Sequence, residues 1–174
     1  MIEPAAEIRA VLDQLAEEAA ASTGPLRLAA LATIAGHEPQ VRHVIIRSFS
    51  RPTLRLVFFC RADDAKFGEI ASHPAVELVS YVRGPDRQLR LAGTAANLTD
   101  AQTLDDFWRR VRPTARGDYV FSRNATDAET TAGALPGDDS RAPLFRAVEV
   151  TIRRVKLLTF ENERWIERSF LPSA

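Results

Sequence analysis

The sequence predicts a mainly β protein: an antiparallel β-barrel with flanking helices, contained in one domain spanning residues 1–174. Three observations support this fold class. Short strand-like runs follow one another from residue 26 to 96, short turn signals separate them, and several runs are almost continuously apolar. Continuous apolar runs indicate strands that are buried on both faces, as in a closed barrel.

The first predicted element is a helix over residues 4–21. Four apolar side chains recur at the helical spacing i, i+3, i+4, i+7, namely Ile8, Val11, Leu12 and Leu15. Thr23-Gly24-Pro25 is expected to end this helix. Five strands are predicted to follow, over residues 26–34, 41–49, 54–60, 76–83 and 88–96.

Further helices are predicted between and after these strands. A short helix is expected over 63–72, and a longer one over 99–111 that opens with a capping box from Thr99 to Gln102. The remaining expectations are a short helix near 114–122, a mobile polar loop over 124–143, and a final hairpin of strands 148–160 and 165–170. No Gly-x-Gly-x-x-Gly follows a strand, so a dinucleotide-binding doubly wound sheet is disfavoured.

Composition narrows the class of partner. Lys+Arg and Asp+Glu balance at 23 each, which disfavours nucleic acid as a partner held by bulk charge. The single cysteine, Cys60, excludes an internal disulfide and a Cys-rich metal site. The N-terminal segment has no basic n-region, and no apolar run approaches the ~20 residues of a membrane helix. A cytoplasmic protein without a membrane partner is therefore expected.

Three cations flank predicted elements in a way that suits a bound phosphate. Arg42 and Arg47 bracket an apolar strand, and Lys66 lies one turn into a short helix. A cofactor phosphate carries about two negative charges, and the arginine fork matches its oxygens. Taken singly, each cation is most simply an ordinary surface charge, and Asp63-Asp64 places negative charge at the same helix end.

The order of these pieces resembles a known family. The pattern consists of Arg42…Arg47, Phe59-Cys60, Lys66, His73-Pro74, Arg87-Gln88 and then Gly93. Over roughly residues 30–112 it is similar to the pyridoxamine 5′-phosphate oxidase-like family, the flavin-binding split barrels. The resemblance implies a split antiparallel barrel that holds flavin mononucleotide (FMN) at the interfaces of a homodimer.

The resemblance also implies a role for each matching residue. Arg42 and Lys66 would bind the flavin phosphate, and Arg47 would lie near the reactive edge of the ring. The backbone of Val44 and Ile45 would run along the ring. The remaining implied contacts are backbone and wall contacts from Phe59 and Cys60, and a bond from Gln88 of the neighbouring subunit.

Several positions depart from the family pattern. Ala65 replaces a second phosphate-binding arginine, and Asp64 replaces a hydroxyl, so a weaker phosphate grip is expected. Trp108 and Arg112 stand where the oxidase has a tyrosine and an arginine for the substrate phosphate. This implies a small anionic substrate near Arg112, with Trp108 as pocket wall. The oxidase's longer C-terminal segment is replaced here by the compact hairpin 155–165, so the vitamin B6 substrate is not assigned.

Other chemistry has little support. His37, His43 and His73 are too scattered to specify a metal site, and Asp105-Asp106 and Asp138-Asp139 are expected to be solvated charges. Packing is the expected role of Cys60. The sequence therefore predicts an FMN-dependent oxidoreductase of unknown substrate. The alternatives are a non-catalytic module that binds FMN or another planar cofactor such as a deazaflavin or haem, and a cofactor-free interaction protein.

Overall fold

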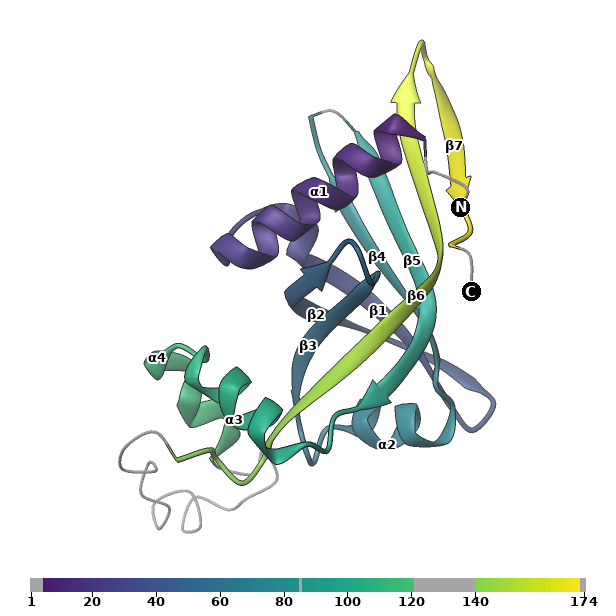
Figure 1. The fold of residues 1–174 in the computed structure, drawn as a ribbon. Coiled ribbons are helices and arrows are strands. Elements are labelled where there is room, and N and C mark those ends of the chain that lie inside the picture. The colour runs from purple at the N-terminus through teal and green to yellow at the C-terminus, as the bar shows by residue number, and fades with distance from the viewer. Residues whose placement is uncertain (1–4, 85, 121–139, 173–174) are drawn as a thin grey trace.

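The structure, a computed structural model, describes residues 5–84, 86–120 and 140–172 (Figure 1). Its strands form one antiparallel sheet: β1 (Leu28–Ala35), β2 (Glu38–Ser50), β3 (Arg55–Arg61), β4 (Ala75–Val82), β5 (Arg87–Asn97), β6 (Phe145–Glu161) and β7 (Arg164–Phe170). The hydrogen-bonded order is β3-β2-β1-β4-β5-β6-β7, and β3 also pairs with β6. This second pairing closes β1 to β6 into a barrel, as the sequence predicted.

The helices lie outside this ring of strands. They are α1 (Ala6–Ala21), α2 (Ala65–Ser72), α3 (Ala101–Arg109) and α4 (Pro113–Arg116), with 3-10 turns η1 (Pro25–Arg27) and η2 (Gly117–Tyr119). Figure 1 shows α1 along the β2 side of the barrel, α2 at the other end, and α3 with α4 outside β3 and β6. None of the helices in the described part of the chain is long and apolar enough to cross a membrane.

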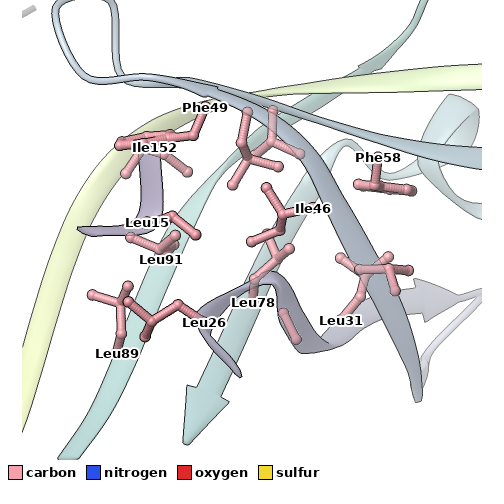
Figure 2. Packing of buried hydrophobic residues seen from close by; sticks show 14 of the residues in the cluster. Leu15, Leu26, Leu31, Ile46, Phe49, Phe58, Leu78, Leu89, Leu91 and Ile152 are labelled. Atoms are coloured by element: carbon pink, nitrogen blue, oxygen red, sulfur yellow. The ribbon is translucent and has the colours of Figure 1, made fainter. Parts of the chain in front are cut away.

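The core of the barrel is built from the side chains that the apolar patterns predicted. The α1 stripe of Ile8, Val11, Leu12 and Leu15 is fully buried against it. Figure 2 shows Leu15 reaching in from the helix toward the side chains of the strands. The labelled strand and turn residues of this core are Leu26, Leu31, Ile46, Phe49, Phe58, Leu78, Leu89, Leu91 and Ile152.

Strand β3 is buried on both faces, which explains its continuous apolar run. Leu56 and Phe58 belong to the barrel core. Val57 faces the other way, into a second cluster beneath α3 that contains Leu104, Trp108 and Phe145. Successive residues of a strand point to opposite faces, so one strand supports both clusters. The functional site described below lies where β3 ends between them.

The region after β5 corrects one prediction and agrees in part with another. The cap of α3 is Asp100, whose Oδ2 accepts from the Thr103 backbone N–H at 2.8 Å, so the predicted capping box from Thr99 is wrong. Aspartate is at least as good a cap as threonine, and this shifts the helix start. The short helix predicted near 114–122 is present as the α-helix α4 followed directly by the 3-10 turn η2, and residues 121 and 122 lie outside the described residues. Of the predicted loop 124–143, residues 124–139 lie outside the described residues.

Candidate functional site

A cavity of about 470 Å³ opens between the middle of β2, the end of β3 and the start of α2. We call it the β2–β3 cavity. This volume lies within the range of small-molecule sites, roughly 300–1,000 Å³. All of the predicted cofactor-binding residues except Gln88 line it, namely Arg42, Val44, Ile45, Arg47, Phe59, Cys60 and Lys66.

Strand β2 supplies most of these residues through its backbone path. Val44 is buried and Ile45 is half-exposed, because neighbouring side chains of a strand point to opposite faces. A ligand that contacts both residues therefore lies along the backbone between them. The pairing of β2 with β3 shifts register between Ile46 and Ser48, which leaves Arg47 at a β-bulge. Bulges commonly re-aim one side chain, and here the Arg47 guanidinium carbon lies 5.5 Å from the centre of the Phe59 ring.

One end of the cavity carries cations that are held by carboxylates. Arg42 donates to Thr33 Oγ1 and forms an ion pair with Glu69 on α2, with Nη2 2.8 Å from Oε2. The Lys66 ammonium lies 2.5 Å from Asp64 Oδ2, and each of these two side chains is 13% exposed. Both cations are thus fixed in position, and both already have an anionic partner.

Arg61 adds a third cation that the sequence analysis missed. Its guanidinium bonds both oxygens of Asp63, at 2.7 and 2.8 Å, and also donates to the carbonyl oxygen of Asp118. The hydrogen bond with Asp63 raises the pKa of this arginine. These bonds tie η2 to the end of β3, and they bring Asp118 and Tyr119 to the cavity wall.

Arg47 differs from the other cations of this cavity. Its Nε is buried and has no hydrogen-bond partner in the described part of the chain. Buried polar atoms are usually satisfied, so an unpartnered donor at a cavity wall indicates a place for an acceptor from a ligand. Arg47 is therefore a donor at this site that a ligand can satisfy without displacing a carboxylate.

Cys60 is a packing residue in this structure. Its thiol is buried, and burial raises its pKa to about 12. The thiolate is the nucleophilic form, so a thiol with this pKa stays protonated and unreactive at neutral pH. The wall of the cavity is therefore uncharged at Cys60.

The remaining predicted site residues lie apart from the β2–β3 cavity. Trp108 is 1% exposed and packs edge-to-face against Phe145 in the second cluster, with ring centres 5.2 Å apart. Arg112 is exposed at the start of α4 and is not among the lining residues. Gln88 lies on β5, across the ring of strands from β2, so within one chain it does not reach the cavity.

The adjacent carboxylates Asp105 and Asp106 do not form a catalytic pair. Asp105 bonds Arg141 at 2.7 Å, whereas Asp106 bonds Arg109 at 2.5 Å. Each of these two α3 carboxylates is therefore paired with a different arginine at the protein surface, as expected of solvated charges. The pair Asp138-Asp139 lies outside the described residues.

Comparison with a family model and with curated relatives points to one protein family. The family model described as pyridoxamine 5'-phosphate oxidase matches residues 15–159. A pyridoxine/pyridoxamine 5'-phosphate oxidase of Anaeromyxobacter dehalogenans is 30% identical over 143 residues, covering 76% of this chain and 71% of the relative. The corresponding oxidase of Azorhizobium caulinodans is 26% identical over 142 residues. The match covers 76% of this chain but spans 63% of that relative's length.

Solved structures share the fold at lower identity. A pyridoxamine 5'-phosphate oxidase-related, FMN binding protein from Nostoc punctiforme has a TM-score of 0.73 and 18% identity, covering 94% of this chain and 96% of its own. PhzG from Burkholderia lata, in complex with tetrahydrophenazine-1-carboxylic acid, has a TM-score of 0.66 and 18% identity, with 97% and 94% covered. With its family-model match over most of its length and this split-barrel architecture, the chain belongs to the pyridoxamine 5'-phosphate oxidase family.

Proposed function

We propose that this chain binds FMN in the β2–β3 cavity and acts as an FMN-dependent oxidoreductase. The observation that carries the proposal is the gathering of Arg42, Arg47, Lys66 and the Val44–Ile45 backbone around one cavity. The family resemblance implies a flavin contact for each of these residues. A structural neighbour named as an FMN binding protein adds support, although its identity of 18% speaks for the fold alone.

The residues of the cavity fit a phosphorylated planar molecule. Arg42 and Lys66 lie at one end, where charge-assisted hydrogen bonds to a phosphate would form. The Val44–Ile45 backbone and the Phe59 and Tyr119 side chains offer a surface for a flat ring. The unpartnered Nε of Arg47 would donate to a polar atom of that ring.

The flavin, when bound, would supply hydride transfer, and the protein would supply binding, orientation and electrostatics. Arg47 would hold a fixed positive charge beside the ring, because its guanidinium is positioned by Phe59. The protonated Cys60 thiol would leave the wall uncharged. Arg112, which has no ion-pair partner in the described part of the chain, would attract a small anionic substrate.

The same proposal includes a homodimer in the cytoplasm. Leu28, Val41 and Ile45 are 54%, 68% and 40% exposed. Leu28 is paired with Ile45 across β1 and β2, and Val41 shares their outward face. A second copy covering this face would bury apolar area and could bring its own Gln88 to the cavity. Light scattering on the purified chain should give twice its mass of 19.3 kDa, and a monomer at all concentrations would contradict this part of the proposal.

The binding proposal is tested by removing one cation at a time. Arg42→Ala and Lys66→Ala should each weaken FMN binding by about tenfold or more, because each removes a charge-assisted contact to the phosphate. Arg109→Ala is the matched control, since Arg109 is an exposed cation on α3 that pairs with Asp106. The measurement is quenching of flavin fluorescence on titration. Unchanged FMN affinity in both cavity variants would reject the site.

Turnover is a separate question from binding. The FMN-loaded protein is mixed anaerobically with candidate amines or with nicotinamide reductants, and the flavin absorbance is followed. Bleaching that recovers on admission of oxygen identifies an oxidoreductase. Retained absorbance with every donor would favour the alternative of a non-catalytic FMN-binding module.

A further inference from the structure

A second cavity, of about 320 Å³, lies between α1, β2, β3 and α3. We call it the α1–α3 cavity. Figure 1 shows α1 and α3 flanking the β2–β3 side of the barrel. Arg47 and Phe59 line both this cavity and the β2–β3 cavity, so these two side chains form the wall between them. The lining contains no carboxylate among the described residues.

The two arginines of this cavity have no carboxylate partner among the described residues. Arg47 and Arg110 both line it, and neither has an ion-pair partner in residues 5–84, 86–120 and 140–172. In the β2–β3 cavity, by contrast, Arg42 and Lys66 are held by Glu69 and Asp64. An anion binds most favourably where it meets fixed positive charge without displacing another anion. On this criterion the α1–α3 cavity is the better anion site.

A buried arginine nearby adds to the positive field. Arg27 is 8% exposed and donates through Nε to the Ile46 carbonyl oxygen at 3.3 Å. Burial lowers the pKa of Arg27, and the positive charges of Arg47 and Arg112 lower it further. The negative charge of Glu18 raises the pKa of Arg27. However, Glu18 already accepts a hydrogen bond from the backbone N–H of Leu26, at 2.7 Å. The guanidinium groups of Arg27, Arg47 and Arg112 therefore lie close enough to interact electrostatically.

Aromatic contacts hold the two lining guanidinium groups in place. The Arg47 guanidinium carbon lies 5.5 Å from the Phe59 ring centre, and that of Arg110 lies 5.5 Å from the Phe107 ring centre. The two rings meet edge-to-face with centres 5.6 Å apart. The order is therefore Arg47, Phe59, Phe107, Arg110. Side chains already ordered in this way lose little freedom when a ligand binds.

The rest of the lining is apolar or neutral. Ala16, Ala19 and Ala20 form one wall from α1, and the Phe rings form another. Ser22 and Ser48 add hydroxyl groups. A volume of about 320 Å³ is at the small end of ligand sites, which begin near roughly 300 Å³. The lining therefore matches a ligand with one anionic group and a compact apolar body.

We propose that the α1–α3 cavity binds a small organic carboxylate with an aromatic or branched apolar body, its carboxylate held by Arg110, with Arg47 adding positive charge from the shared wall. The arginine fork bonds both oxygens of a carboxylate, and the apolar body fills the space between the α1 alanines and Phe107. This site lies on the other side of the Arg47–Phe59 wall from the flavin cavity, and Arg110 lines this cavity alone of the two.

The probe for this site is benzoate, with benzamide as the uncharged control, titrated calorimetrically into the full chain as purified. We expect saturable binding of benzoate and at least about tenfold weaker binding of benzamide, because the charge-assisted bonds are lost. Arg110→Gln should weaken benzoate by about tenfold or more. The neighbouring Arg109→Gln, which alters a cation paired with Asp106, should not.

A second variant tests the apolar part of the cavity. Ala20→Leu adds bulk from an exposed helix position with little risk to folding, and it should abolish benzoate binding while the circular dichroism spectrum stays unchanged. Equal benzoate affinity in wild type, Arg110→Gln and Ala20→Leu would overturn the proposal, as would the absence of saturable binding to wild type. Inorganic phosphate binding as tightly as benzoate would overturn the apolar part. FMN affinity, measured in parallel, should be unchanged in Arg110→Gln, which separates this result from the flavin proposal.

Discussion

Replacing Asp64 by asparagine should tighten FMN binding while leaving riboflavin binding unchanged. Asp64 Oδ2 lies 2.5 Å from the Lys66 ammonium, which the proposal assigns to the flavin phosphate. The carboxylate therefore neutralises part of the Lys66 charge that would otherwise attract the phosphate. Asparagine keeps an oxygen that can accept from the Arg61 backbone N–H, now bonded to Asp64 at 3.0 Å, so the start of α2 should be preserved.

The size of the effect follows from the geometry at Lys66. A phosphate oxygen bonded to the same ammonium at about 2.8 Å would lie roughly 4.3 Å from Asp64 Oδ2, at the tetrahedral angle. Two unit charges at about 4 Å repel by about 1 kcal/mol in water and about 4 kcal/mol at an effective dielectric constant of 20. Both side chains are 13% exposed, which places the pair between these limits. We expect a gain of about 1–3 kcal/mol, or roughly 5- to 150-fold in FMN affinity.

The assay is a fluorescence titration of wild type and Asp64→Asn with FMN and with riboflavin, at a pH of about 8 where the phosphate is fully ionised. Asp106→Asn, an exposed carboxylate on α3, is the matched control. The ratio of FMN to riboflavin affinity should rise only in Asp64→Asn. An unchanged or lower ratio, in a variant that still binds riboflavin, would refute the placement of the phosphate beside Lys66.

Three further predictions concern packing and burial. A Cβ added at Gly93 would lie 2.2 Å from the Thr151 carbonyl oxygen, so Gly93→Ala should force β5 away from β6 and lower the free energy of unfolding by about 1–3 kcal/mol or more; an unchanged urea midpoint would contradict this close approach. At a pH of about 8, a thiol with a pKa of about 12 is ionised to roughly one part in 10⁴, so iodoacetamide should modify Cys60 in the unfolded chain and not in the native one. Because the unfolded thiol ionises near its ordinary value of 9.0, the contribution of Cys60 to stability should fall as pH rises from there toward 12, and Cys60→Ala should remove that slope.

Elements with a strong periodic pattern could be predicted from the sequence. The α1 stripe ends up fully buried, and the unbroken apolar run of β3 reflects burial on both faces. Arg42, Arg47 and Lys66 line one cavity because the order of the strands brings the middle of β2 and the end of β3 beside α2. In α1 and β3 the local apolar pattern determines which side of the element each residue faces.

Features that depend on side-chain geometry had no comparable signal. The pairing of Arg42 with Glu69 joins β2 to α2 and depends on how the helix is oriented. The bulge at Arg47 changes the strand only by one residue of its apolar alternation, since Val44, Ile46 and then Phe49 face the core. Tyr119 reaches the cavity from a segment of short turns without periodicity, held there by Arg61. The position of Arg61 directly after Phe59-Cys60 was the one hint that it would share their cavity.

The most direct test of the central claim is identification of what the purified chain binds. A visible absorption spectrum is recorded, the released cofactor is identified by mass spectrometry, and the stripped protein is titrated with FMN. The account predicts a flavin spectrum, the mass of FMN, and saturation near one FMN per chain. A colourless protein that shows no saturable FMN binding, or one that carries haem or a deazaflavin instead, would contradict it.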